Sequence, residues 1–184
     1  DEARVMLRVN SPRKHPHVLA VSYVCSPADR DDELLFLEQL VEGQTLTQLI
    51  SSDRLYAGNS EEVAIRLQRM FMQLLSALAH VHSVGILHQD VKPDNIMVDT
   101  QTWDVCLIDF GVATIGQGNA RGGVTAQMKG ATPSHCSPEQ RDLQTYVAAA
   151  RDHEERHRRL REQPLTQRSD VWAAAVTCLD TFCG

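Results

Sequence analysis

One long amphipathic stretch near the middle of the chain constrains its fold most. Between Ser60 and His82, apolar residues recur at the three- and four-residue spacings of one helix face, namely Val63, Leu67, Phe71, Leu74, Leu75, Leu78 and Val81. Asn59 and Glu62 form a capping pair at its start, and Gly85 follows its last turn. Three short apolar runs typical of small β-strands come next, at 86–87, 96–98 and 105–108. The sequence therefore predicts an α+β fold.

The residues before this helix predict shorter elements: a helix at 2–9, strands at 18–24 and 34–40 around an acidic turn at 26–33, and a short helix at 46–50. After the strands, residues 110–138 are rich in glycine and lack periodicity, which indicates a mobile loop. Arginines and acids mix along 141–163, as in a solvated helix. Residues 169–183 are almost uncharged, and we expect a buried helix there.

Composition excludes some classes of protein. The formal net charge of −6 argues against recognition of nucleic acid by charge. No apolar run approaches the ~20 residues that cross a bilayer, so we expect no membrane partner. The five cysteines are odd in number and form no Cys-x-x-Cys pair. We expect reduced thiols in an intracellular, cytoplasmic protein, and a chain cut from a longer one because it does not begin with Met.

Two groups of polar residues stand in the breaks between the predicted strands. The segment HQDVKPDN at 88–95 places Asp90, Lys92 and Asn95 within six residues. The triplet Asp109-Phe110-Gly111 follows the apolar run VCLI, and Asp109 lies fourteen residues after Asn95. The first segment thus places an acid, a base and an amide on one loop between two apolar strands.

Together these motifs resemble the catalytic loop and the Asp-Phe-Gly motif of eukaryotic protein kinases, serine/threonine type. Three further segments follow the order of that family. ATPSHCSPEQ at 131–140 is similar to the end of the activation segment, and RSDVWAAAVTCLDTFCG at 168–184 to the start of the central buried helix. EARVMLRV, followed by HPHVLAV, is similar to the end of helix αC. The resemblance covers the whole chain.

The resemblance implies a protein-kinase-like, bilobal α+β fold, truncated to a remnant of the small β lobe and the first half of the mainly helical large lobe. Residues 1–40 would be the C-terminal part of the small lobe, with the end of αC and two strands. Residues 41–184 would be a partial large lobe, with helices αD, αE and αF, the catalytic loop and the activation segment. The charged stretch 141–163 would be an insertion, either a plain solvated helix or a docking surface.

The resemblance also implies catalytic roles. Asp90 would accept or orient the proton of the substrate hydroxyl, and Lys92 would contact the γ-phosphate of ATP. Thr132 would bond near both. Asn95 and Asp109 would bind Mg²⁺ beside the nucleotide phosphates, because this cation prefers oxygen ligands.

The remaining cofactor-binding candidates implied by the resemblance lie away from the catalytic loop. They are Gly111, Met97, Glu2 and the gatekeeper, for which Leu37 is our choice and Glu38 the other option. Glu2 matches the αC glutamate, whose lysine partner lies upstream of this chain in the family, together with the glycine-rich phosphate loop. We therefore expect the isolated chain to be nearly inactive.

Packing roles follow from the same resemblance. Met6, Val21, His88 and Phe110 would stack as the regulatory spine, with His88 packing against Phe110. Asp170 would anchor the stack. An acid that opens an apolar helix needs a partner or backbone amides, and the resemblance places those amides on the catalytic loop.

Two residues depart from the family pattern, and a third lacks its usual partner. Gln89 stands where most members have arginine, so the loop is of the non-RD type and cannot form a charge-assisted pair with a phosphorylated activation loop. His135 replaces a tyrosine, and Glu139 would normally pair with an arginine beyond this chain. Hydroxyl groups that could be modified, or could be plain loop hydroxyls, are those of Thr114, Thr125, Ser134 and Ser137.

Lys92 and Thr132 together look like the serine/threonine branch. We therefore expect a kinase fragment that transfers the γ-phosphate of Mg-ATP to Ser/Thr hydroxyls, with ATP and Mg²⁺ as cofactors and proteins as substrates; the oligomeric state stays open. A pseudokinase scaffold and a small-molecule phosphotransferase are the alternatives.

Overall fold

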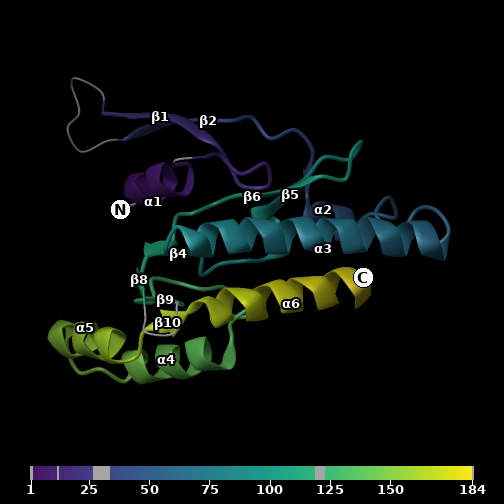
Figure 1. Cartoon of the computed structure of the whole chain (residues 1–184). Coiled ribbons are helices and arrows are strands. Elements are labelled where there is room, and N and C mark those ends of the chain that lie inside the picture. The colour runs from purple at the N-terminus through teal and green to yellow at the C-terminus, as the bar shows by residue number, and fades with distance from the viewer. Residues whose placement is uncertain (1, 12, 27–33, 119–122, 184) are drawn as a thin grey trace.

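Figure 1 shows the computed structural model of the chain, which describes all residues except 1, 12, 27–33, 119–122 and 184. Helix α1 (Glu2–Val9) lies beside the antiparallel strands β1 (Val21–Cys25) and β2 (Leu35–Glu38). The predicted turn between these strands lies outside the described residues, apart from Ser26. Below them in this view, α3 (Ser60–Ser83) and α6 (Gln167–Cys183) run side by side.

Three other small antiparallel sheets complete the framework. The first joins β3 (Gln44–Thr45), β5 (Ile96–Val98) and β6 (Val105–Leu107). The second pairs β4 (Ile86–Leu87) with β7 (Thr114–Ile115). The third joins β8 (Gln117–Gly118), β9 (Val124–Ala126) and β10 (Leu165–Thr166). The remaining helices are α2 (Leu46–Ile50), η1 (Pro93–Asn95), α4 (Pro138–Ala148) and α5 (His153–Glu162). The α+β prediction is confirmed.

Local signals explain where α3 begins and which face it buries. The Asn59 side chain accepts a hydrogen bond from the Glu62 amide, and the Glu62 side chain accepts one from the Asn59 amide. This capping box satisfies two amides that the first turn leaves unpaired. The buried face carries Leu67, Met70, Leu74, Ala77, Leu78 and Val81.

A continuous buried cluster connects α1 and β1 to α3, β5, β6 and the start of α6. It includes Met6, Leu74 and Phe110, each at most 2% exposed. Truncating a leucine at such a position to alanine typically costs about 2–5 kcal/mol of stability. Because the cluster crosses from the N-terminal elements into the helices, α3 and the strands that follow it form one rigid support for the polar loops. The division of the chain at residue 40 stays a prediction.

Three predictions about the C-terminal half need correction. Residues 110–138 are not a loop throughout, because they contain β7, β8 and β9, although 119–122 lie outside the described residues. These strands are only two or three residues long and take their partners from distant parts of the chain, so no local periodicity reveals them. The predicted buried helix at 169–183 forms as α6 but is buried on one face only, since Trp172 and Phe182 are 41% and 56% exposed.

The charged stretch 141–163 is two helices rather than one. Asp152 caps α5 by accepting a hydrogen bond from the Glu155 amide, at 2.8 Å. The Arg159 guanidinium carbon lies 4.4 Å from the centre of the Tyr146 ring, so α5 folds back against α4. Helix α4 also buries Leu143 and Val147, whereas α5 has no buried residue. The solvated-helix prediction therefore holds for α5 alone.

Candidate active site

One buried carboxylate on α6 holds the loop between β4 and β5 in place. Asp170, in the first turn of α6, is 1% exposed. Its Oδ2 accepts a hydrogen bond from the His88 amide at 2.9 Å, and its Oδ1 accepts one from the Gln89 amide at 2.8 Å. The predicted anchoring of the loop by Asp170 is confirmed. Because buried backbone amides need hydrogen-bond partners, these two bonds fix the position of the loop relative to α6.

Asp90 lies at the centre of a tight polar cluster. Its Oδ1 accepts hydrogen bonds from the Thr132 amide at 3.0 Å and from the Thr132 hydroxyl at 2.6 Å. Its Oδ2 lies 2.8 Å from the Lys92 ammonium group and 3.1 Å from Nδ2 of Asn95. Lys92 Nζ also donates to the Thr132 hydroxyl, at 2.8 Å. The structure thus brings Asp90, Lys92, Thr132 and Asn95 together.

These contacts decide the charge of Asp90. Burial raises the pKa of this carboxyl group, but hydrogen bonds from Lys92 and Thr132 and the charge of Lys92 outweigh burial. The pKa of Asp90 is therefore lowered, and the group is an anion at neutral pH. A carboxylate with four donors around it is a weak base, so it is better suited to orient a hydroxyl group than to remove its proton early.

Asp109 and Asn95 present oxygen atoms beside this cluster. The Asp109 side chain is exposed, and its Oδ1 accepts a hydrogen bond from the Gly111 amide at 3.1 Å. A Cβ atom at Gly111 would lie 3.2 Å from the same oxygen, so glycine leaves room for the carboxylate. Asp109 has φ 62°, a left-handed conformation that non-glycine residues adopt mostly where surrounding structure enforces it. Here the backbone bond from the Ile108 amide to Asn95, at 3.0 Å, ties the two segments together.

His88 supports the site from inside the core. Its ring packs edge-on against Phe110, with 4.8 Å between ring centroids, as predicted. Burial lowers the pKa of His88, so the ring is neutral. Its Nε2 donates to the Ile108 carbonyl at 3.1 Å, and its Nδ1 accepts from the Asp90 amide at 3.4 Å. Met6 and Val21 are buried in the same region of the core, at 1% and 6% exposed.

A carboxylate, a lysine and a threonine meet at a short polar loop, an Asp-Phe-Gly triplet follows it in the sequence, and a buried aspartate of α6 anchors the loop. A family model described as "Protein kinase domain" matches residues 1–184. This chain belongs to the protein kinase domain family.

Individual relatives agree with the family model. CBL-interacting protein kinase 22 of Oryza sativa subsp. japonica is 36% identical over 165 residues, which are 89% of this chain and 31% of that protein. Maternal embryonic leucine zipper kinase of Danio rerio is 26% identical over 188 aligned positions, 100% of this chain and 23% of that protein. Serine/threonine-protein kinase nekl-2 of Caenorhabditis elegans is 28% identical over 177 residues, 94% of this chain and 43% of that protein. The chain spans less than half of the length of each of these relatives.

Gln89, at the usual arginine position, connects the catalytic loop (88–95) to residues 114–129 of this kinase domain. We call residues 114–129 the activation segment. Its side-chain nitrogen donates to the Thr114 hydroxyl and, at 2.9 Å, to the Gln127 carbonyl. Its Oε1 accepts a hydrogen bond from the Lys129 amide, also at 2.9 Å. Gln89 is 4% exposed and has φ 68°. The side-chain amide thus uses both N–H donors and its carbonyl acceptor on β7 and on 127–129.

The other predicted cofactor residues of the kinase domain are placed less centrally. Met97 lies half-buried on β5, between Thr45 and Cys106 in register. Glu2 is exposed at the start of α1. Leu37 and Glu38 are exposed on β2, where Leu37 is 63% exposed. None of these side chains bonds to the Asp90 cluster, and their roles stay predictions.

Sequence reasoning missed His82 and the contacts of His135 and Glu139. His82, in the last turn of α3, contacts Oδ2 of Asp170 through Nε2 at 2.8 Å. Its place opposite the catalytic loop depends on the packing of α3 on α6, and no local pattern signals it. The His135 ring lies near Asp180, with Nε2 to Oδ2 at 3.2 Å. Glu139 accepts a hydrogen bond from the Ser169 hydroxyl, at 3.1 Å.

No helix in the described part of the chain is long and apolar enough to cross a membrane.

Proposed function

We propose that this kinase domain transfers the γ-phosphate of ATP to serine or threonine hydroxyl groups of protein substrates. The observation that carries the proposal is the Asp90 carboxylate, whose Oδ1 is held by Thr132 and whose Oδ2 is held by Lys92. Phosphoryl transfer needs little covalent chemistry from the protein, so positioning and charge neutralisation are its main tasks. The Asp90 cluster offers both.

Asp90 would hold the acceptor hydroxyl in line with the phosphoryl group. Because its pKa is lowered, Asp90 stays ionised and accepts an O–H···O⁻ hydrogen bond from the acceptor hydroxyl. The proton would move to the carboxylate late, when the hydroxyl oxygen has gained a bond to phosphorus and become acidic. Thr132 keeps the carboxylate from turning away, since its amide and hydroxyl both bind Oδ1.

Lys92 would stabilise the charge on the transferred group. Its ammonium group lies between Asp90 and Thr132 and is half-buried, so its field is less screened than that of a surface lysine. A cation preset near the acceptor stabilises negative charge as the phosphoryl group approaches, without reorganisation. This role requires no movement of the catalytic loop.

Asn95 and Asp109 fit a magnesium site. Nδ2 of Asn95 donates to the Asp90 carbonyl at 2.8 Å and to its carboxylate at 3.1 Å, which directs Oδ1 away from Asp90. In the described ranges, no three His, Cys, Asp or Glu residues gather as metal ligands. One carboxylate and one amide oxygen suit Mg²⁺, which takes its other ligands from phosphates and water. Bound with ATP, Mg²⁺ would neutralise charge on the β- and γ-phosphates.

The substrate class follows from Thr132 and from the relatives. Thr132 contacts both Asp90 and Lys92, as the resemblance to the serine/threonine branch implied. One relative carries the name serine/threonine-protein kinase, which supports the same class.

The five cysteines are all unpaired, which supports a reducing, intracellular environment.

Replacing Asp90 with asparagine tests the proposal. The Asp90→Asn variant of the natural protein that carries this chain should lose about 10²–10⁴-fold in kcat for transfer of labelled phosphate from ATP to a protein acceptor. Asp53→Asn, an exposed carboxylate on the α2–α3 loop, is the control and should keep its activity. Equal transfer by the Asp90→Asn variant and the unaltered protein would refute the proposal. Transfer to small metabolites, with proteins inert as acceptors, would also refute it.

A further inference from the structure

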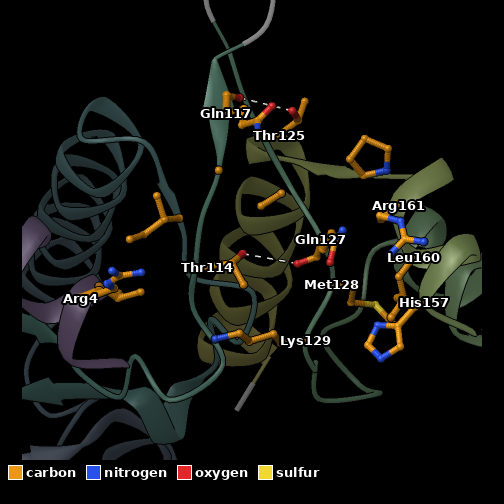
Figure 2. A pocket seen from close by; sticks show the side chains of 15 residues that line it. Arg4, Thr114, Gln117, Thr125, Gln127, Met128, Lys129, His157, Leu160 and Arg161 are labelled. Carbon is orange, nitrogen blue, oxygen red and sulfur yellow. Dashed lines mark hydrogen bonds between the residues drawn. The ribbon is translucent and has the colours of Figure 1, made fainter. Parts of the chain in front are cut away.

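A pocket that Asp90 does not line lies between α1, the activation segment and α5. Its volume is about 790 Å³, and it is enclosed by α1, by strands β7 and β9, by 127–129 and by α5 (Figure 2). None of the residues proposed to bind substrate or ATP lines it. Because α5 lies in the charged stretch 141–163, which the family resemblance predicts to be an insertion, this stretch and the activation segment form two walls of the pocket.

The lining of this pocket is positively charged. Its basic side chains are Arg4 from α1, Lys129 from the activation segment, and His157 and Arg161 from α5, and none of the described residues that line it is acidic. Figure 2 shows His157 and Arg161 on one side of the pocket and Arg4 on the other. The chain as a whole has 24 acidic and 18 basic residues. The charge of the described pocket lining is therefore opposite in sign to the net charge of the chain. The pocket is therefore complementary to an anion.

Two arginines of α5 are paired within the helix, whereas a third lines the pocket. Arg158 lies 3.7 Å from both Glu155 and Glu162, and Arg159 lies 2.7 Å from Glu155. These pairs neutralise charge within the helix. His157 and Arg161 are four residues apart, so they share a helix face, and that face lines the pocket. Within the described residues, Arg161 and Arg4 form neither an ion pair nor a side-chain hydrogen bond.

The fold of the activation segment uses Lys129, whose Nζ donates to the Ala113 carbonyl at 3.4 Å, but neither Arg4 nor Arg161 bonds to it within the described residues. Gln89 closes this segment with neutral hydrogen bonds to Thr114, Gln127 and Lys129. The Thr125 hydroxyl, which lines the pocket, donates to the Gln117 carbonyl at 3.3 Å. The arginines thus remain available to a ligand from outside the chain. Guanidinium groups bind phosphate oxygens in bidentate pairs, a geometry that a single carboxylate fills less completely.

We propose that this pocket binds a phosphorylated residue of a partner protein, with α5 as one wall of the site. The volume leaves room for the residues that flank the phosphoryl group, because ligand pockets of 300–1,000 Å³ are typical for molecules of that size. The charged insertion is then a docking surface. This inference goes beyond phosphoryl transfer and does not depend on it.

Binding of a short phosphopeptide tests the inference. The probe is the acetylated and amidated peptide Gly-Ala-phosphoserine-Ala-Gly, and its unphosphorylated twin is the reference. Isothermal titration calorimetry is carried out on the natural protein that carries this chain, without nucleotide, so failure here is distinct from failure of the proposed kinase activity. We expect the phosphopeptide to bind at least about tenfold more tightly than its twin, a difference of about 1.4 kcal/mol. Raising the salt concentration should weaken binding of the phosphopeptide.

Matched variants locate the site. Arg161→Ala and Arg4→Ala should each weaken phosphopeptide binding about five- to tenfold, by loss of one partly desolvated charge-assisted contact. Arg156→Ala removes an exposed arginine from the same helix that does not line the pocket, and it should leave binding unchanged. Both helices are exposed at these positions, so thermal melts should confirm that every variant folds.

Three results would overturn the inference. The first is equal affinity for the two peptides. The second is a loss in Arg156→Ala as large as that in Arg161→Ala, which would indicate only diffuse charge. The third is a protein that carries phosphate on Thr125 by mass spectrometry and binds the peptide only after phosphatase treatment, because the chain's own phosphate would then be the ligand.

Discussion

Replacing Gln89 with leucine tests whether this side chain closes the activation segment. Leucine has a similar volume but can neither donate to Thr114 and Gln127 nor accept from Lys129. The fold of the core should survive, because the anchoring bond from the Gln89 backbone amide to Asp170 is unaffected. The change therefore acts on the contact between the catalytic loop and 127–129.

The magnitude follows from the lost hydrogen bonds. Each neutral hydrogen bond contributes about 0.5–1.5 kcal/mol net, so the loss of three should cost about 3 kcal/mol. Since 1.4 kcal/mol corresponds to a factor of ten, opening of the segment should become about 100-fold more frequent. Thr132 follows this segment directly and binds Asp90, so kcat should fall while the KM for ATP changes little.

Amide hydrogen exchange measures this opening directly. The Lys129 amide donates to Oε1 of Gln89 at 2.9 Å, so its exchange should accelerate about 100-fold in Gln89→Leu. Gln101→Leu, at an exposed glutamine in the turn after β5, is the matched control and should show unchanged exchange at Lys129. If Lys129 exchanges equally in Gln89→Leu and in the unaltered protein, the side chain of Gln89 does not hold the segment and the reasoning fails.

Further predictions concern the anchor, the pH dependence and the thiols. Asp170→Asn should lower the free energy of unfolding by about 2–4 kcal/mol in urea denaturation, because two buried backbone amides share this carboxylate; a loss below about 0.5 kcal/mol would contradict the anchoring role. The pKa of Asp90 is lowered in the folded state, so its stabilising contribution is present above its ordinary pKa and is lost as the pH falls through the lowered value. The difference in unfolding free energy between the unaltered protein and Asp90→Asn should therefore be constant from about pH 5 to 8 and shrink below about pH 4, whereas a difference that shrinks above pH 5 would contradict this assignment. Burial raises the pKa of the Cys106 thiol to about 11, so iodoacetamide at pH 8 should modify exposed Cys25 first in peptide mass spectrometry; equal rates at both thiols would contradict it.

Predictions from the sequence succeeded where the determinants are local. Helix α3 was expected at 60–82 and occupies Ser60–Ser83, because its cap and its apolar spacing both lie within the segment. Predictions from the sequence failed where contacts between residues far apart in the sequence determine the structure. Strands β7 and β9 exist because β4 and β10 pair with them. The break between α4 and α5 depends on the contact of Arg159 with Tyr146, which neither charge pattern nor helix propensity reveals.

The candidate site shows the same division. Motifs in the sequence identified Asp90, Lys92 and Asn95, which lie within one loop. The contacts that set their chemistry are long-range, since Thr132 is 42 residues from Asp90 and Asp170 is 81 residues from Gln89. Sequence spacing alone cannot give the lowered pKa of Asp90, because that pKa depends on how closely Thr132 and Lys92 approach the carboxylate.

The neutral side chain at position 89 has a physical reason. The side chain is 4% exposed, so an arginine there without a phosphate partner would be a buried, unpaired charge, which costs several kcal/mol. Glutamine avoids this cost and binds the carbonyl of Gln127 and the amide of Lys129, groups that are present whether or not a hydroxyl is modified. A phosphate brought to the same place would meet no guanidinium at position 89, so the charge-assisted pair that an arginine there could form would be missing. We therefore expect the order of this activation segment to be set by its own backbone contacts, with the arginines of the neighbouring pocket left to a different ligand.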